Sequence, residues 1–213
     1  MVKVVVLDVD GTLMDTNYLH TEAWAWAFER AGHRVPRVRL HKQVGKGAGL
    51  LIREFVDDEE TVEKIQDLHS EFYGELQEYG HPLPGAKELI SSLKERGYEV
   101  WFVTSAKDEE LEHHMQELEA EDSVDGVVNS SAVENPKPAP DIFEEALRRA
   151  GASADETVAV GDAVWDVEAA REAGIRTVAV LSGGAYHKEA LEEAGAVAVY
   201  EDCAALLDSD FPE

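Results

Sequence analysis

The residues best suited to chemistry are two aspartates that follow an apolar run near the N-terminus. Residues 2–7 read VKVVVL, and Asp8, Val9 and Asp10 come directly after them. In an extended chain, residues i and i+2 point to the same side, so Asp8 and Asp10 would present two carboxylates to one place. Like charges this close repel each other. The pair is therefore a candidate catalytic pair, provided that a neutralising group lies beside it.

Other reactive side chains also follow apolar runs. They are Thr104 and Ser105 at the end of EVWFVT (99–104), Lys137 in NPKPAP (135–140) after the run 125–130, and Asp162 and Asp166 after TVAVG (157–161). In a parallel sheet the carboxyl ends of the strands meet at one edge, and ligands bind there. The sequence therefore predicts one site that combines several acids, a hydroxyl group and a single lysine.

The elements that would position these side chains alternate along the chain. Short β-branched runs predict strands at 2–7, 99–104, 125–130, 157–161, 176–180 and 196–200. Helical patterns lie between them at 86–97, 108–120, 140–151, 167–174 and 188–195. Hydrophobic strands that alternate with amphipathic helices are typical of a parallel sheet covered on both faces. The predicted fold class is α/β, with a doubly wound parallel sheet.

One long stretch interrupts this alternation. Between residues 16 and 82 no convincing strand is found, and helical patterns occupy 19–32, 49–56 and 59–76. The chain is therefore predicted to have an α/β core of residues 1–15 and 83–213, with a helical insertion of residues 16–82. Hinges between the two are expected near Asp15-Thr16 and near residues 82–85.

The composition disfavours several classes of partner. Asp and Glu number 45 against 19 Lys and Arg, a formal net charge of −26. Such a surface repels nucleic acid and anionic membranes, so neither is an expected partner. The acids are spread along the chain, which indicates solvated helix surfaces; adaptation to high salt is the alternative. The chain has one cysteine and no apolar run of membrane length, so we expect a soluble, cytoplasmic protein.

Four segments resemble, in order, the four motifs of the haloacid dehalogenase superfamily. They are DVDGT (8–12), VTS (103–105), PKPAPDIF (136–143) and GDAVWD (161–166). The helical insertion resembles the cap domain of phosphoglycolate phosphatase and β-phosphoglucomutase relatives. The resemblance covers essentially the whole chain. It implies a Rossmann-like core with a helical cap, and a Mg²⁺-dependent phosphatase that hydrolyses a small phosphorylated metabolite through an aspartyl-phosphate.

The resemblance also implies roles for individual residues. The implied catalytic residues are Asp8 as nucleophile, Asp10 as general acid and base, and Thr104 and Lys137 as stabilisers of the phosphoryl group. The implied phosphate- and substrate-binding residues are Gly11, Thr12, Thr104, Ser105, Lys137 and Lys46. Magnesium would be held by Asp8, the Asp10 carbonyl, Asp162 and Asp166, the last directly, through water or from outside the ligand shell. Asp10 must be neutral in one step and ionised in the next, so its pKa must be tunable.

Two alternatives remain open at this point. A phosphomutase of the β-phosphoglucomutase type would use the same residues but transfer the phosphoryl group to a sugar hydroxyl. A phospho-aspartate signalling module, similar to a receiver domain, also combines acids, a hydroxyl and a lysine, but receivers are much shorter. Dehalogenation is disfavoured because dehalogenases of this superfamily lack the second aspartate, which here is Asp10. The oligomeric state stays open, and a monomer is compatible with the sequence.

Several weaker signals have a structural interpretation. Trp24, Trp26 and Phe28 alternate and cannot all share one helix face, so most should pack within the insertion and one could line the substrate pocket. His113 and His114 are adjacent on a helix, which argues against a shared zinc site and favours surface or core positions. Cys203 lies outside all four motifs and is expected to be inert packing.

Overall fold

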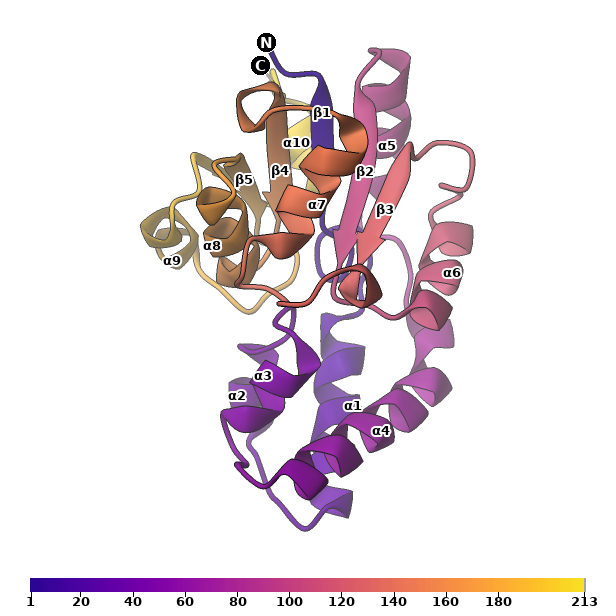
Figure 1. The fold of residues 1–213 in the computed structure, drawn as a ribbon. Coiled ribbons are helices and arrows are strands. Elements are labelled where there is room, and N and C mark those ends of the chain that lie inside the picture. The colour runs from indigo at the N-terminus through magenta and orange to yellow at the C-terminus, as the bar shows by residue number, and fades with distance from the viewer. Residues whose placement is uncertain (213) are drawn as a thin grey trace.

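A six-stranded parallel sheet forms the centre of the molecule within residues 1–212, which the computed structural model describes (Figure 1). In chain order the strands are β1 (Val4–Leu7), β2 (Glu99–Thr104), β3 (Gly126–Asn129), β4 (Thr157–Gly161), β5 (Arg176–Val180) and β6 (Ala198–Tyr200). The spatial order is β3-β2-β1-β4-β5-β6. This is a doubly wound order, and it differs from the 2-1-3-4-5 order of receiver domains. The predicted fold class is confirmed, and the signalling alternative loses its structural basis.

The strand register brings two of the predicted site residues together. In the pairing of β1 with β4, Leu7 lies opposite Val160, so Asp8 lies at the level of Gly161 and next to Asp162. β1 also pairs with β2, and the strand order reverses at β1. Ligands bind in the crevice beyond the carboxyl ends at such a reversal. The topology therefore places this crevice at Asp8.

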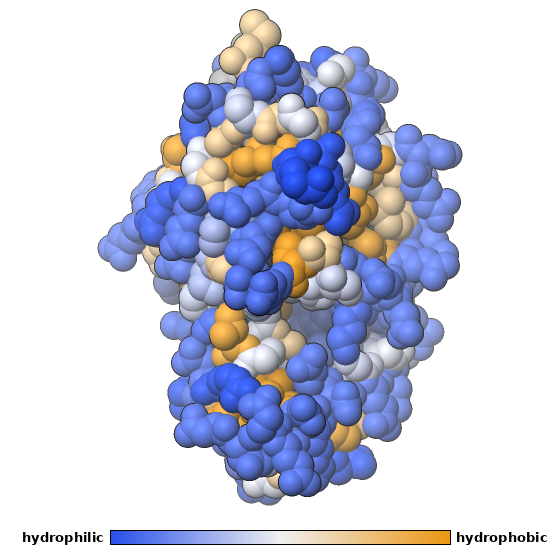
Figure 2. All heavy atoms as spheres, in the orientation of Figure 1, coloured by the Kyte–Doolittle hydropathy of each residue, from blue (hydrophilic) through white to orange (hydrophobic). Residues whose placement is uncertain are grey.

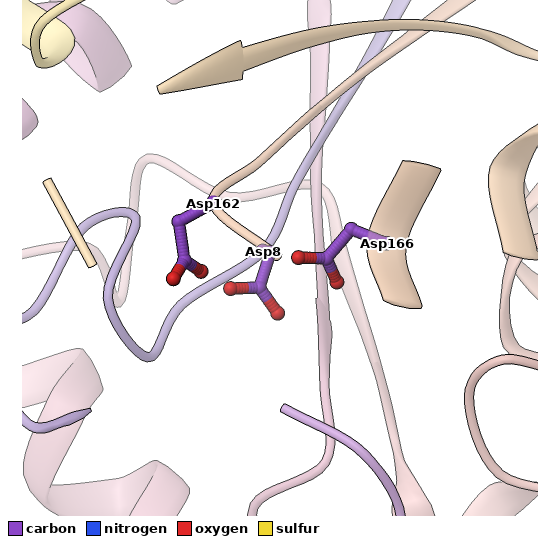
Figure 3. A group of neighbouring side chains, drawn as sticks. All are labelled: Asp8, Asp162 and Asp166. Carbon is purple, nitrogen blue, oxygen red and sulfur yellow. The ribbon is translucent and has the colours of Figure 1, made fainter. Parts of the chain in front are cut away.

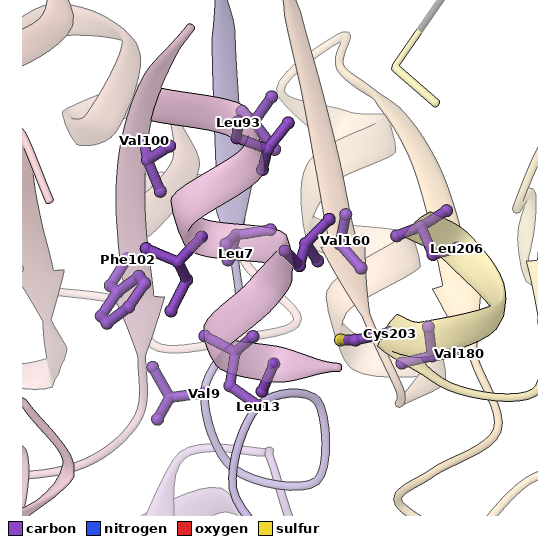
Figure 4. Packing of buried hydrophobic residues seen from close by; sticks show 14 of the residues in the cluster. Leu7, Val9, Leu13, Leu93, Val100, Phe102, Val160, Val180, Cys203 and Leu206 are labelled. Atoms are coloured by element: carbon purple, nitrogen blue, oxygen red, sulfur yellow. The ribbon is translucent and has the colours of Figure 1, made fainter. Parts of the chain in front are cut away.

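Helices cover both faces of the sheet because alternate strand residues point to opposite sides. Val5 and Leu7 face the side covered by α5 (Ala86–Glu95), α6 (Asp108–Glu117) and α10 (Cys203–Leu207). Val4 and Val6 face α7 (Asp141–Ala150) and α8 (Val164–Glu172). The last helix, α9 (Lys188–Ala194), packs beside α8. Figure 4 shows the first of these two cores packed around α5.

The helical insertion has a core of its own beyond the carboxyl ends of the strands (Figure 1). It consists of α1 (Asn17–Arg30), α2 (Arg37–His41), α3 (Ala48–Arg53) and α4 (Glu59–Leu76). Trp24 and Phe28, four residues apart on α1, are both buried in this core, where Trp24 stacks on His69 of α4 and Phe28 meets Phe55 edge to face. Trp26 lies on another side of α1, where it meets Phe72 edge to face at a centroid distance of 5.7 Å. The three aromatic side chains therefore do not share one face, as predicted.

The predicted strands are all present, and the differences concern helices. Helix α8 begins at Val164, three residues before the predicted start at 167, because the Asp166 side chain accepts a hydrogen bond from the Ala163 N–H at 3.0 Å and caps the first turn. Helices α2 and α10 were not predicted, because five residues are too few to show a helical period. No helix within residues 1–212 is long and apolar enough to span a membrane.

Candidate active site

Lys137 and Asp8 form a buried ion pair at the carboxyl end of β1. The loop before α7 brings the Lys137 Nζ within 2.6 Å of Asp8 Oδ1 and 2.8 Å of Asp166 Oδ1. Asp8 is 4% exposed and Lys137 is 1% exposed. Burial alone would lower the pKa of Lys137, but the charges of Asp166 and Asp8 outweigh it and raise this pKa above its usual value. Lys137 is therefore a permanent cation at the centre of the site.

Asp8, Asp162 and Asp166 bring three carboxylates together from β1 and from the segment that follows β4 (Figure 3). One oxygen of each lies within 4.8 Å of the other two. Burial and the charge of Asp166 raise the pKa of Asp8 to about 7, although Lys137 opposes this shift. Burial, Asp166 and Asp8 likewise raise the pKa of Asp162 well above its usual value. Three buried acids beside a single ammonium group need more positive charge than Lys137 supplies.

This donor set fits a hard divalent cation. The three side chains offer only carboxylate oxygens, which are the ligands that Mg²⁺ prefers in proteins. A bound dication would relieve the mutual repulsion that raises the pKa values of Asp8 and Asp162. The predicted ligands Asp8, Asp162 and Asp166 thus come together, whereas the side chain of Asp10 turns elsewhere and leaves only its backbone carbonyl for the predicted role.

The turn after β1 holds in place the three carboxylates of Asp8, Asp162 and Asp166, here called the acidic group. The Thr12 hydroxyl lies 3.1 Å from Asp8 Oδ2 and 3.3 Å from Asp162 Oδ1, so it can donate to either carboxylate. Gly11 has φ +83°, a conformation that favours glycine, and a Cβ there would lie 2.7 Å from Asp162 Oδ2. Thr12 and Gly11 therefore shape the acidic group, which places them beside the predicted phosphate site.

Asn17 is a site residue that the sequence analysis did not identify. Its Nδ2 donates to Asp162 Oδ2 at 2.9 Å and to the Gly183 carbonyl at 3.2 Å. Asn17 is the first residue of α1, so it ties the insertion to an acid of the core. Its short distance in sequence from the first motif was the only available signal. The contact with Gly183 joins residues 166 positions apart, which no local pattern reveals.

Asp10 lies in an environment unlike that of Asp8. Its Oδ1 accepts a hydrogen bond from the Thr16 hydroxyl at 2.7 Å and lies 3.3 Å from His20 Nε2. Thr104 donates to Asp10 Oδ2 at 3.2 Å, and His114 Nε2 lies 3.7 Å from Oδ1. Burial alone would raise the pKa of Asp10, but His114, His20 and Thr16 together hold this pKa well below its usual value. Asp10 is a carboxylate here, surrounded by hydrogen-bond donors.

A group of imidazole and phenol rings supports Asp10 from both parts of the molecule. His20 stacks on Tyr73 at a centroid distance of 3.8 Å, and its Nδ1 lies 3.3 Å from His69 Nε2. The Tyr73 hydroxyl lies 3.4 Å from His114 Nε2, and His114 belongs to α6 of the core. His114 is fully buried, which agrees with the core position that the sequence offered as one of two possibilities. Its place beside Asp10 was not predicted. The rings of His113 and His114 have a centroid distance of 6.2 Å and are tilted by 56° to each other.

Comparison with known proteins identifies the family. The sequence profile of the haloacid dehalogenase-like hydrolases matches residues 2–174. The chain is a haloacid dehalogenase-like hydrolase. A crystallised hydrolase from Pseudomonas syringae is 34% identical and superposes with a TM-score of 0.91, over 97% of this chain and 96% of that one. The predicted membership is confirmed.

Two relatives have names that state an activity. The phosphorylated carbohydrates phosphatase of Thermotoga maritima is 29% identical over 202 residues, which cover 92% of this chain and 93% of that protein. The phosphoglycolate phosphatase of Rhodospirillum rubrum is 29% identical over 220 aligned positions, which cover 98% of this chain and 90% of that protein. The alignments extend over nearly the full length of all three proteins.

The remaining predicted residues of the hydrolase lie on the wall of the pocket beside Asp8 and Asp10. Ser105 lines it and donates to the Gly45 carbonyl at 3.0 Å, a contact between core and insertion. Lys46 also lines it, but its Nζ pairs with Glu54 at 2.7 Å. Trp24 is the pocket-lining aromatic residue of α1. The structure thus brings all ten predicted site residues to one region, with Lys46 at its edge.

Proposed function

We propose that this hydrolase is a Mg²⁺-dependent phosphatase that releases phosphate from a small phosphorylated metabolite through an aspartyl-phosphate on Asp8. The names of the two relatives, a phosphorylated carbohydrates phosphatase and a phosphoglycolate phosphatase, support this reaction class. The contrast between Asp8 and Asp10 carries the proposal. Asp8 joins Lys137 and two further carboxylates. Asp10, two residues on, instead accepts hydrogen bonds from Thr16 and Thr104, so the two side chains lie in environments suited to different roles.

Asp8 fits the role of nucleophile. One of its oxygens would attack phosphorus in line with the leaving oxygen, forming a P–O bond as the bond to the alcohol breaks. Lys137 would counter the charge on the phosphoryl oxygens in this step, since it already lies 2.6 Å from Asp8 Oδ1. Asp8, Asp162 and Asp166 would hold Mg²⁺, which would supply further positive charge to the transferring group.

Asp10 fits the role of proton carrier. The leaving alkoxide needs a proton in the first step, and the attacking water must lose one in the second, when the bond between phosphorus and Asp8 breaks. The ionised Asp10 of this structure suits the second step. For the first step Asp10 must itself gain a proton, and its pairing with His20 opposes this, because the proton stays on the group with the higher pKa. Hydrogen bonding to Asp10 and its charge raise the pKa of His20 against the effect of burial.

The helical insertion fits the role of a cap. Residues 16–82 would form this cap domain and residues 1–15 and 83–213 the catalytic core. Trp24, Val44 and Leu51 of the insertion line the pocket from the side opposite Asp8. His20 and Asn17 reach from the insertion to Asp10 and Asp162. Closure of the cap would then exclude water and complete the set of groups around the two aspartates.

Release of inorganic phosphate tests this function. The substrates would be p-nitrophenyl phosphate, phosphoglycolate and several sugar phosphates, each with Mg²⁺ and with EDTA. We expect metal-dependent turnover that Asp8→Asn abolishes, because the amide cannot act as the nucleophile. Asp15→Asn is the matched control, since Asp15 is an exposed aspartate of the same segment. Turnover by Asp8→Asn at the wild-type rate would refute the proposal. Isomerisation of a hexose phosphate without phosphate release would assign the mutase activity instead.

A further inference from the structure

A large cleft continues from the catalytic pocket between the insertion and the core. The pocket at Asp8 and Asp10 encloses about 70 Å³, whereas the cleft measures about 660 Å³. The two share wall residues, among them Gln66, Ser70 and Glu110. Figure 2 shows a recess between the two parts of the molecule, with hydrophilic residues on most of its rim. The transferring phosphoryl group would fill the pocket, so the rest of the substrate must lie in the cleft.

The charge of the cleft is negative. Four acidic side chains line it, from the start of α6 and the loop before α7: Asp108, Glu109, Glu110 and Glu134. The cleft has a single lysine in its wall, Lys107, whose Nζ donates to Ser70 Oγ at 2.7 Å. Like charges disfavour each other most where little water separates them. A second phosphate or a carboxylate on the substrate would therefore be repelled here.

The two other lysines near the pocket are already paired. Lys46 pairs with Glu54 at 2.7 Å, and its side chain is only 11% exposed. Lys137 lies between Asp8 and Asp166. Neither ammonium group is available to a distant anionic group of the substrate. Among the described residues that line the cleft, Lys107 is therefore the only cation beside the four acidic side chains.

The uncharged groups of the cleft suit hydroxyl ligands. Its wall includes the side chains of Gln66, Gln77, Ser70, Ser105, Ser130 and Ser131. Serine hydroxyls and carboxamides can both donate and accept, and carboxylates accept from hydroxyl donors. Tyr73, Val133 and Pro136 add apolar surface for C–H groups. This combination matches the faces of a polyol or sugar.

We propose that the substrate is a phosphate monoester of a neutral, polyhydroxylated alcohol, and that the acidic cleft rejects substrates with a second anionic group. This inference rests on the proposed phosphatase function and adds the class of leaving group. The acidic residues act as a selectivity element, because repulsion of competing anions is as effective as attraction of the correct substrate.

The test uses pairs of esters that differ in one charged group. Glycerol 3-phosphate is compared with 3-phosphoglycerate, and glucose 6-phosphate with 6-phosphogluconate, by phosphate release with Mg²⁺. We expect kcat/KM to be at least about ten-fold higher for the neutral member of each pair at low salt. The ratio should fall in molar salt, because screening weakens repulsion but leaves shape unchanged. p-Nitrophenyl phosphate reports the phosphatase reaction itself.

Two variants locate the effect in the cleft. Glu109→Gln and Glu134→Gln change exposed acids of its wall, and each should lower the ratio in favour of the neutral esters. Glu112→Gln on the same helix is the matched control and should leave the ratio unchanged.

The inference would be overturned, while the phosphatase function stands, by equal turnover within both pairs. It would also be overturned if neither salt nor these variants changed the ratio of kcat/KM between the neutral and the charged ester. So would preference for phosphoethanolamine over glycerol 3-phosphate, or hydrolysis of p-nitrophenyl phosphate with refusal of every neutral ester. No phosphate release from any compound, p-nitrophenyl phosphate included, would instead overturn the proposed function itself.

Discussion

Lys137 offers the sharpest test of how the acidic group is held together. Its side chain has no exposed area and pairs with Asp8 at 2.6 Å and Asp166 at 2.8 Å. The change Lys137→Met keeps a long flexible side chain but removes the charge. It would leave the carboxylates of Asp8, Asp162 and Asp166 buried together without a cation. Removal of one partner of a buried ion pair costs about 3–5 kcal/mol, because the remaining charge stays desolvated.

We expect a loss of this size in the free energy of unfolding, measured by urea titration in EDTA at pH 8. The loss should be smaller at pH 5.5, because Asp8 can then take up a proton and become neutral. It should also be smaller with Mg²⁺, which would replace part of the missing charge.

Two comparisons separate this effect from a loss of packing. Lys3→Met removes an exposed partner of Glu156, with the Lys3 side chain 66% exposed, and should change stability far less. The double variant Lys137→Met/Asp166→Asn should recover part of the loss, because one of the unpaired charges is gone. If Lys137→Met were as stable as the wild type in EDTA at pH 8, the electrostatic account of the site would be wrong.

Three further predictions concern the same structure. The pKa of Asp8 is raised from 3.8 to about 7, so between these values the folded metal-free protein keeps a proton that the unfolded chain releases. The free energy of unfolding in EDTA should therefore fall as the pH rises from about 4 to about 7. Asp8→Asn should make this dependence on pH weaker. Asn17→Ala frees Asp162 from its amide donor and should weaken Mg²⁺ binding by roughly 10–100-fold in calorimetry, whereas unchanged affinity would argue against the contact. Gly126→Ala places a methyl group 2.3 Å from the Trp101 ring and should destabilise by about 1–3 kcal/mol. Gly74→Ala, in open space on helix α4, should stabilise by about 0.5–1 kcal/mol, and the opposite order of the two in thermal unfolding would contradict the packing described.

The sequence by itself determined the sheet, most of its helices and the family. Each core strand is a short apolar run that alternates with an amphipathic helix, and such local patterns are readable without contacts. The residues of the acidic group were predictable for the same reason. Asp8 and Asp162 each follow a strand directly, and parallel strands end at one edge. Thr104 is the last residue of β2, and Lys137 lies in the loop between β3 and α7.

Only the tertiary structure decided the environments of Asp8 and Asp10. The two residues are nearly equivalent in sequence, yet one joins Asp162, Asp166 and Lys137 while the other joins His20 and His114. From the sequence, both carboxylates were expected at one place with different roles, and the histidines were given no part in the site.

The physical reason is that these environments come from distant parts of the chain. His114 reaches Asp10 only because α6 lies next to α4 of the insertion, where Tyr73 meets His114, and Asn17 reaches Asp162 only because α1 begins at the sheet edge. A helix period fixes which residues share a face, but not which face of another element they meet. The acidic cleft arises in the same way, from α4, the start of α6 and the loop before α7. The sequence gives the net charge of the chain, but only the folded structure places these acidic side chains beside the pocket.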